Sequence, residues 1–66
     1  MALTLKAARV NAGLTQVDVA RALHVTNVTV SNWERGEKSP TLYQACKLVE
    51  MYGITLNDLI IPEKQV

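Results

Sequence analysis

The sequence has little of what small domains use as internal cross-links. Among its 66 residues are one cysteine, Cys46, and one histidine, His24. A lone thiol excludes an internal disulfide, and two such side chains are fewer than the three or four protein ligands of a zinc site. A domain of this size then depends on dense packing or on self-association for its stability. We therefore expect no metal ion and no cofactor.

Further absences exclude whole classes of protein function. The sequence lacks a glycine-rich phosphate loop, and His24 lies far along the chain from Cys46, so no pair of nucleophile and base is predicted. We expect a protein that is not an enzyme. No run approaches the roughly 18 consecutive apolar residues of a membrane span, and the first residues lack the apolar core of a signal peptide. Together with the single thiol, these absences favour the cytoplasm.

What is present is typical of a folded domain. Hydrophobic residues make up 48% of the chain and charged residues 20%, with a net charge of +1. We predict one domain over residues 1–66, with its core in residues 3–61 and a polar tail at 62–66. Residues 1–49 hold six Lys and Arg against three acids, whereas residues 50–66 hold one against three. The two ends are therefore expected to serve different purposes.

Apolar residues recur with a period of 3.6 between glycine and proline positions, which predicts an all-α fold of five helices. Threonine caps and glycine stops delimit them: Thr4 to about Asn11, Thr15 to Leu23, Thr26 to Gly36, Pro40 and Thr41 to Gly53, and a last short helix from Thr55 that carries Leu56, Leu59 and Ile60. The expected buried faces contain Leu5, Ala8, Ala12, Val19, Ala20, Leu23, Val30, Trp33, Leu42, Ala45, Cys46, Val49 and Tyr52. Short connections then force steep helix crossings.

The stretch from Leu14 to Gly36, LTQVDVARALHVTNVTVSNWERG, holds several features of a corner between two helices. Ala20 is small where the third helix must pass close over the second, Val25 follows the turn, and Trp33 begins the WERG end of the third helix. With these features the sequence resembles the helix-turn-helix domains of phage repressor and Cro-like (Xre-type) regulators over roughly residues 3–61. The resemblance implies a compact five-helix lambda-repressor-like fold that binds double-stranded DNA.

His24 departs from the family, which usually has glycine at this turn so that the chain can adopt a positive φ. Histidine tolerates that backbone region better than most residues do. We interpret His24 as a turn residue rather than as a ligand or a pH sensor. Its conformational cost should be about 1 kcal/mol or less.

The third helix carries the predicted reading surface. If Val30 and Trp33 point inward, helical spacing turns positions 27, 28, 31 and 32 outward, and none of these is a long charged residue. Asparagine can bond two edge atoms of adenine, and valine methyls can contact the methyl of thymine. The plain alternative is a solvated polar face without function. The resemblance assigns base reading to Asn27, Val28 and Asn32, with Thr29 as a further contributor.

Anchoring to the DNA backbone is expected around the same helix. The first amides of the second and fourth helices are donors at positive dipole ends, which can hold phosphate oxygens. The resemblance implies that Gln16 contacts the DNA backbone and supports the third helix, and that Arg9 pairs with Glu34 to tie the first helix to the third. The remaining predicted phosphate contacts are Arg35, Lys38, Ser39 and Thr41.

We expect a sequence-specific transcription regulator, a repressor that occupies an operator and excludes RNA polymerase. One domain offers too few phosphate contacts for tight binding, so we predict a homodimer on an inverted repeat with half-sites roughly 10 base pairs apart. Ile61 is the candidate contact between subunits, whereas Leu59 and Ile60 are expected to close the core. The alternative is a protein-interaction module, such as an antitoxin-like partner, which predicts little affinity for duplex DNA.

Overall fold

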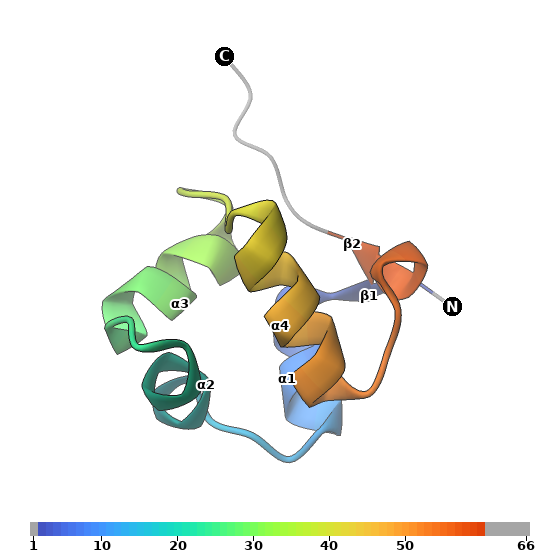
Figure 1. Cartoon of the computed structure of the whole chain (residues 1–66), viewed down its shortest axis with the longest axis horizontal. Coiled ribbons are helices and arrows are strands. Elements are labelled where there is room, and N and C mark those ends of the chain that lie inside the picture. Colours follow the sequence, from blue (N-terminus) through green and yellow to red (C-terminus); the bar gives the residue numbers. More distant parts are fainter. Residues whose placement is uncertain (1, 61–66) are drawn as a thin grey trace.

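The structure, a computed structural model, describes the backbone of residues 2–60 and their side chains except that of Ile60. Four α-helices carry this part of the chain: α1 (Leu5–Asn11), α2 (Gln16–Leu23), α3 (Asn27–Arg35) and α4 (Leu42–Tyr52). A 3₁₀ helix, η1 (Leu56–Asp58), and two short strands, β1 (Leu3–Thr4) and β2 (Leu59–Ile60), complete it (Figure 1).

Threonine side chains begin the α-helices, as the sequence predicts. In each case the hydroxyl oxygen accepts a hydrogen bond from the amide three residues on, which satisfies one of the donors that a helix start leaves unpaired. The caps are Thr4, Thr15, Thr26 and Thr41. At Thr15 the bond is reciprocal, because the Thr15 amide donates to the Asp18 carboxylate at 2.9 Å. Each such cap stabilises its helix by about 1 kcal/mol.

The prediction of a fifth helix that carries Leu56, Leu59 and Ile60 is wrong. After Thr55 the chain makes a single 3₁₀ turn, η1, and then extends as β2. This strand pairs in parallel with β1, so that Leu3 lies opposite Leu59 and Thr4 opposite Ile60. The segment is too short to offset the cost of helix nucleation. Extended residues instead find backbone partners on β1, and a β-branched residue such as Ile60 suits a strand.

The core lies between the four α-helices of the described chain. Its buried members are Leu5, Ala8, Val19, Ala20, Val30, Trp33, Leu48 and Tyr52, with Ala45 and Val49 also buried and Leu23 and Leu59 packed at the edge. Three residues predicted to be buried are exposed instead: Ala12, Leu42 and Cys46. The core is thus close to the predicted one except at the end of α1 and along α4.

The error on α4 concerns which stripe of the helix turns inward. The buried stripe runs through positions 45, 48, 49 and 52, a spacing that leaves Leu42 and Cys46 to one side. Leu48, which the prediction missed, is 1% exposed. Leu42 is the first residue of α4 and is 75% exposed, whereas Leu48 lies within the helix, where it can pack against the core. Ala12 is exposed because it lies beyond the last residue of α1.

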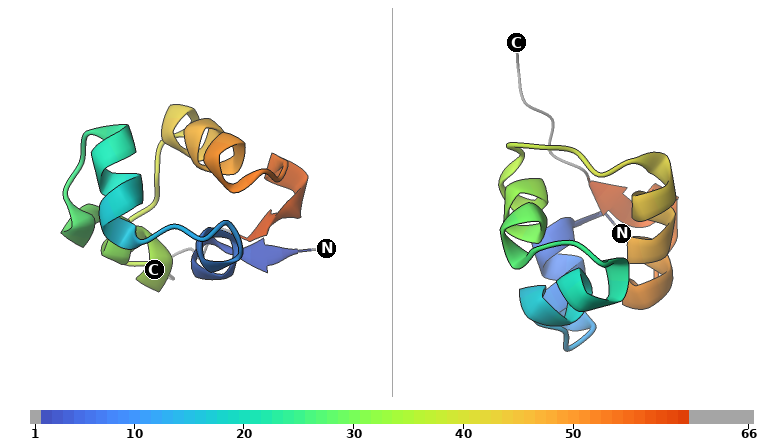
Figure 2. Two further views of the ribbon diagram at one scale, coloured as in Figure 1. Left: turned by 90° about the horizontal axis from the view of Figure 1, so that it is seen from below. Right: turned by 60° about the vertical axis from the view of Figure 1, so that its left-hand side comes forward.

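The helices are arranged so that α2 and α3 pack directly against each other, while α1 contacts both α3 and α4. Figure 2 shows α4 across the molecule from α3. Every helix within residues 2–60 is too short or too polar to span a bilayer. The arrangement leaves one side of α3 uncovered by the other helices.

Candidate nucleic-acid interface

Three residues link α2 to α3, and their backbone makes the corner between the two helices. His24 has φ 58° and ψ 42°, which lies in the left-handed region that histidine tolerates. The Val25 amide donates to the Ala20 carbonyl at 3.0 Å and closes the end of α2. Thr26 then caps α3. The interpretation of His24 as a turn residue is confirmed.

Buried residues on one side orient α3. Val30 is 1% exposed and Trp33 is 3% exposed, both within the core. On the opposite side Asn27 is exposed and Val28 is 60% exposed. Helical geometry explains the contrast, since residues three and four apart share a face. The side of α3 that faces solvent therefore begins with an amide and an apolar methyl group.

The rest of this side is half-buried, with side chains that already have partners. Thr29 places its hydroxyl 3.0 Å from the Thr26 hydroxyl. One turn farther along, the Arg35 guanidinium donates from Nη2 to the Asn32 side-chain oxygen Oδ1 at 2.6 Å. The sequence predicts Asn32 and Arg35 as separate contacts, one to a base and one to a phosphate. Their i,i+3 spacing on one helix was the signal that could have linked them.

A buried ion pair ties α1, the start of α2 and the end of α3 together. Arg9 donates to Glu34 through Nε at 2.7 Å and through Nη2 at 3.3 Å, and through Nη1 to the Leu14 carbonyl at 2.8 Å. Gln16 adds a bond from Nε2 to the same carboxylate at 3.0 Å. The two charged side chains are 10% and 5% exposed. The pair that the resemblance implied is present, and Gln16 does support α3.

The electrostatics of this cluster follow from burial and charge. The hydrogen bond to Glu34 raises the pKa of Arg9 above its ordinary value, although burial opposes this effect. Burial raises the pKa of the nearby Tyr52 phenol to about 12, and the negative charge of Glu34 adds to the rise. Tyr52 therefore stays neutral at physiological pH, and Arg9 stays a cation.

The predicted phosphate contacts lie at the start of α2, at the end of α3 and in the segment between α3 and α4. Arg35, Lys38, Ser39 and Thr41 are exposed, and Gln16 is half-buried. The Thr41 hydroxyl accepts from the Gln44 amide at 3.1 Å, so its own proton can still be donated outward. Through the bond to Glu34, Gln16 brings the start of α2 next to the last turn of α3.

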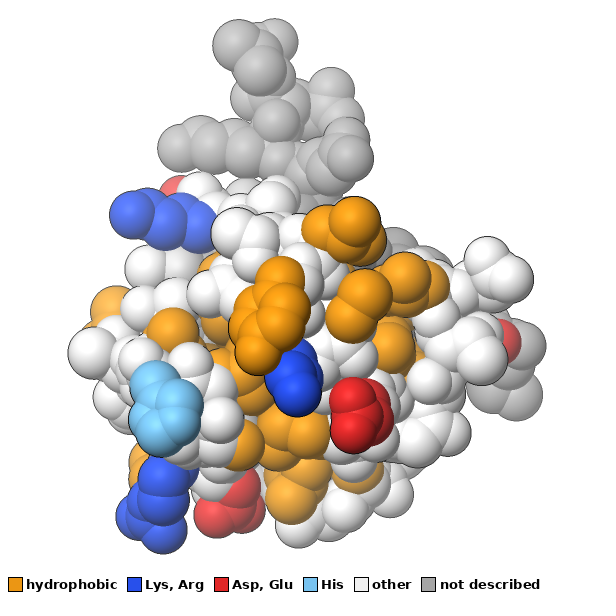
Figure 3. Space-filling view, viewed as in Figure 1, with side chains coloured by type: hydrophobic (Ala, Val, Ile, Leu, Met, Phe, Trp, Pro, Cys, Tyr) orange, Lys and Arg blue, Asp and Glu red, His pale blue; other side chains and the backbone are white. Residues whose placement is uncertain are grey.

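An exposed apolar surface on α4 is not among the predicted features. Leu42 is 75% exposed and Tyr43 is 71% exposed. The ammonium of Lys47 lies 5.7 Å from the centre of the Tyr43 ring, in cation–π range. Figure 3 shows apolar side chains gathered over α4 on this face. The signal was present in the sequence, because Tyr43 lies off every buried stripe of its helix.

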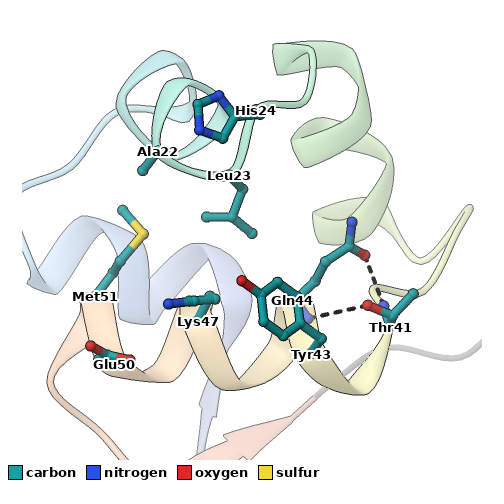
Figure 4. Close-up of a pocket in the computed structure, with 9 residues that line it drawn as sticks. All are labelled: Ala22, Leu23, His24, Thr41, Tyr43, Gln44, Lys47, Glu50 and Met51. Atoms are coloured by element: carbon teal, nitrogen blue, oxygen red, sulfur yellow. Dashed lines mark hydrogen bonds between the residues drawn. The ribbon is translucent and has the colours of Figure 1, made fainter.

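A hollow of about 540 Å³ adjoins this surface, between the end of α2 and α4 (Figure 4). It is lined by Ala22, Leu23, His24, Thr41, Tyr43, Gln44, Lys47, Glu50 and Met51. Across it His24 and Leu23 approach from α2, while Tyr43, Lys47 and Met51 belong to α4. Among residues 2–60, no three histidine, cysteine or acidic side chains gather as metal ligands would. The hollow is a mixed apolar and charged groove.

Comparison with known proteins places this geometry in a family. The helix-turn-helix family profile matches residues 5–59, from the first residue of α1 to the first residue of β2. The chain belongs to the Cro/C1-type helix-turn-helix family of transcriptional regulators. The corner at His24 is the turn of this motif, and α2 and α3 are its two helices. The protein thus carries a helix-turn-helix DNA-binding domain, and the family is not enzymatic.

Two known proteins are similar to this chain over most of its length. The sequence is 36% identical over 59 residues to an uncharacterized HTH-type transcriptional regulator of Methanocaldococcus jannaschii, and the match covers 89% of each chain. It is also 36% identical over 56 residues to the HTH-type transcriptional regulator ImmR of Bacillus subtilis. That match covers 85% of this chain but 44% of ImmR. No solved structure matches the chain.

Proposed function

We propose that this helix-turn-helix protein binds specific duplex DNA sequences with α3 in the major groove, and represses transcription by occupying an operator and excluding RNA polymerase. The main support for the proposal is the side of α3 that faces solvent. Asn27 is exposed and Val28 is 60% exposed, while the buried Val30 and Trp33 hold the helix from behind. The major groove admits one α-helix, and amide and methyl groups distinguish the base-pair edges displayed there.

The reading residues differ in what they offer to a base. Asn27, in the first turn of α3, presents an amide that can both accept from and donate to adenine. Val28 presents methyl groups suited to the methyl of thymine. Asn32 lies on the same side, with one amide atom engaged by Arg35. Thr29 contributes less, because it is half-buried and its hydroxyl faces Thr26.

Anchoring residues flank this helix. Lys38, Ser39 and Thr41 follow α3 directly and are exposed, so they can contact the phosphates beside the groove. Arg35 is exposed at the last turn of α3 and can reach a phosphate in the same way. Gln16 keeps a second amide proton after its bond to Glu34, and that proton can be donated to a phosphate oxygen.

A homodimer on an inverted repeat completes the proposal. A single α3 with a few phosphate contacts is too small for tight specific binding at physiological salt. Two copies of α3 about 34 Å apart would read half-sites one helical turn apart. The predicted subunit contact, Ile61, lies outside the described residues. Leu59 packs against the core, as expected of a residue that closes it.

Selection from random duplexes tests the proposal. We expect one recurring inverted repeat, bound with an affinity that falls steeply as salt is added. Asn32→Ala should relax base preference at one position of each half-site, whereas Lys38→Ala should weaken binding to all sequences alike. If both variants lower affinity uniformly, the division between reading and anchoring residues is wrong. Sedimentation with and without the selected duplex measures the stoichiometry, for which two chains per repeat are expected.

The second candidate function is a protein-interaction module, and the exposed α4 surface favours it. Leu42 and Tyr43 lie together at the start of α4 beside the hollow, away from the buried stripe of that helix. Exposed apolar side chains of this size are common at protein contacts. This function predicts no salt-dependent binding to duplex DNA. The salt titration of the selected and random duplexes therefore separates the two candidates.

A further inference from the structure

The bond between Arg35 and Asn32 fixes which end of the Asn32 amide faces Arg35. The amide oxygen and nitrogen of asparagine are similar in size, and their positions are assigned from their hydrogen-bond partners. A guanidinium group only donates hydrogen bonds. The atom 2.6 Å from Arg35 Nη2 must therefore be the oxygen Oδ1. The other end of the amide, Nδ2, then points away from Arg35 with its two protons.

The pair consequently offers donors to whatever binds α3. Nδ2 of Asn32 carries two N–H groups, and the Arg35 guanidinium keeps further N–H groups beyond the one on Oδ1. Adenine shows an acceptor next to a donor in the major groove, so it pairs with an amide whose oxygen is available. Guanine shows two adjacent acceptors, N7 and O6. Donors at this end of the amide complement guanine, whereas pairing with adenine would require the oxygen that is turned toward Arg35 to face the base.

The neighbouring ion pair leaves Arg35 available to bond Asn32, because Glu34 is already bonded to Arg9. Glu34, the residue before Arg35, accepts at one carboxylate oxygen from Arg9 Nε and at the other from Arg9 Nη2 and Gln16. Its side chain is 5% exposed and turned toward α1. Arg35 is exposed on the solvent side of the same turn, where it meets Asn32. A charged donor to an amide oxygen is among the stronger hydrogen bonds, and it strengthens as DNA displaces water.

We propose that Arg35 is a positioning residue that acts through Asn32, and that the two side chains together select guanine at one position of each half-site. The proposal rests on the proposed function, because it requires α3 to lie in the major groove. It departs from the adenine pairing expected of a free asparagine. It also gives Arg35 a role that a phosphate contact alone does not have, since a phosphate contact carries no base preference.

The test uses the full chain and four duplexes that differ only at the base pair whose preference Asn32→Ala removes. For the unchanged protein we expect guanine to be favoured over adenine by roughly tenfold. Arg35→Met removes the guanidinium and keeps a side chain of similar length. It should reduce the preference for guanine over adenine to roughly twofold or less, because the Asn32 amide can then rotate and accept from adenine. Preferences at all other positions should stay unchanged.

Lys38→Met is the matched control, since it removes one exposed positive charge just after the same helix. It should weaken binding to all four duplexes by the same factor. The proposal is overturned if Arg35→Met behaves in this uniform way, or if the unchanged protein favours adenine at the Asn32 position. Both results leave sequence-specific binding intact. A protein that selects no sequence at all defeats the proposed function itself, and the guanine assignment with it.

Discussion

The two sides of α3 share nine residues of one helix and differ in almost everything else. The inner side places Val30 and Trp33 in the core and Glu34 in a buried ion pair with Arg9. The outer side presents Asn27 and groups that can bond to a base edge. The inner side sets where the helix lies, because its residues make the contacts with the core and with α1. Stability and recognition should therefore be separable within this one helix.

The largest expected effect lies on the inner side. Glu34→Gln should lower the free energy of unfolding by about 3 kcal/mol, because it leaves the buried guanidinium of Arg9 without a counter-charge. Urea unfolding followed by circular dichroism measures the loss. The control is the double variant Arg9→Met with Glu34→Leu, which replaces both charges by apolar groups and should cost less than Glu34→Gln alone. A loss below about 0.5 kcal/mol for Glu34→Gln would show that the pair behaves as an exposed one.

The outer side should respond in the opposite way. Asn27→Ala should lower the affinity for the selected operator by about tenfold, through the loss of a two-bond contact to one base. The free energy of unfolding should change by less than about 0.5 kcal/mol, as for other exposed substitutions. Titrations against the operator and its single-base variants, together with thermal melts, measure both quantities. A clear fall in melting temperature would mean that the two sides are not separable.

The corner between α2 and α3 belongs to neither side of α3, and a substitution there should change the stability of the fold by a smaller amount. His24→Gly should raise the free energy of unfolding by up to about 1 kcal/mol, since glycine adopts the observed φ of 58° without strain. His24→Ala is the matched control and should not stabilise the protein. Urea midpoints of the three proteins measure the order. If His24→Gly lowers the midpoint, the imidazole makes a stabilising contact that the turn geometry does not explain.

The smallest effect concerns pH and the start of α2. Hydrogen bonds from Thr15 hold the pKa of Asp18 below its ordinary value of 3.8. The pKa of Asp18 is lower in the folded protein than in the unfolded chain, so the ionised carboxylate stabilises the fold at pH values above 3.8. This stabilisation is lost as the pH falls through the pKa of the folded state. The melting temperature should therefore fall below about pH 4. Asp18→Asn should make this fall shallower, and an unchanged acid slope would contradict the assignment.

Much of the local structure could be predicted from the sequence. The threonine caps, the stop at Gly36 with φ 78° and the turn at His24 all lie where the sequence predicts them. These features depend on hydrogen bonds between residues three or four positions apart. The outward placement of Asn27 and Val28 also follows from helical spacing once Trp33 is assigned to the core.

The errors on β2 and α4 fall where a partner distant in the sequence decides the outcome. Residues Leu59 and Ile60 have apolar character that fits a helix or a strand, and only the presence of β1 selects the strand. On α4 two stripes share the helical period, and packing against the other helices buries the one with Leu48. The bond between Arg35 and Asn32 is a local contact: the i,i+3 spacing allows it, but the spacing does not specify the side-chain rotamers that form it.

The sequence by itself determined the four α-helices, their ends and the corner between α2 and α3, because capping bonds and left-handed turns are local and act before distant segments meet. The tertiary structure alone decided which face of α4 is buried and that the first and last described segments pair as strands. Each of these choices has several locally acceptable solutions, and the contacts that distinguish them form only when the chain is folded.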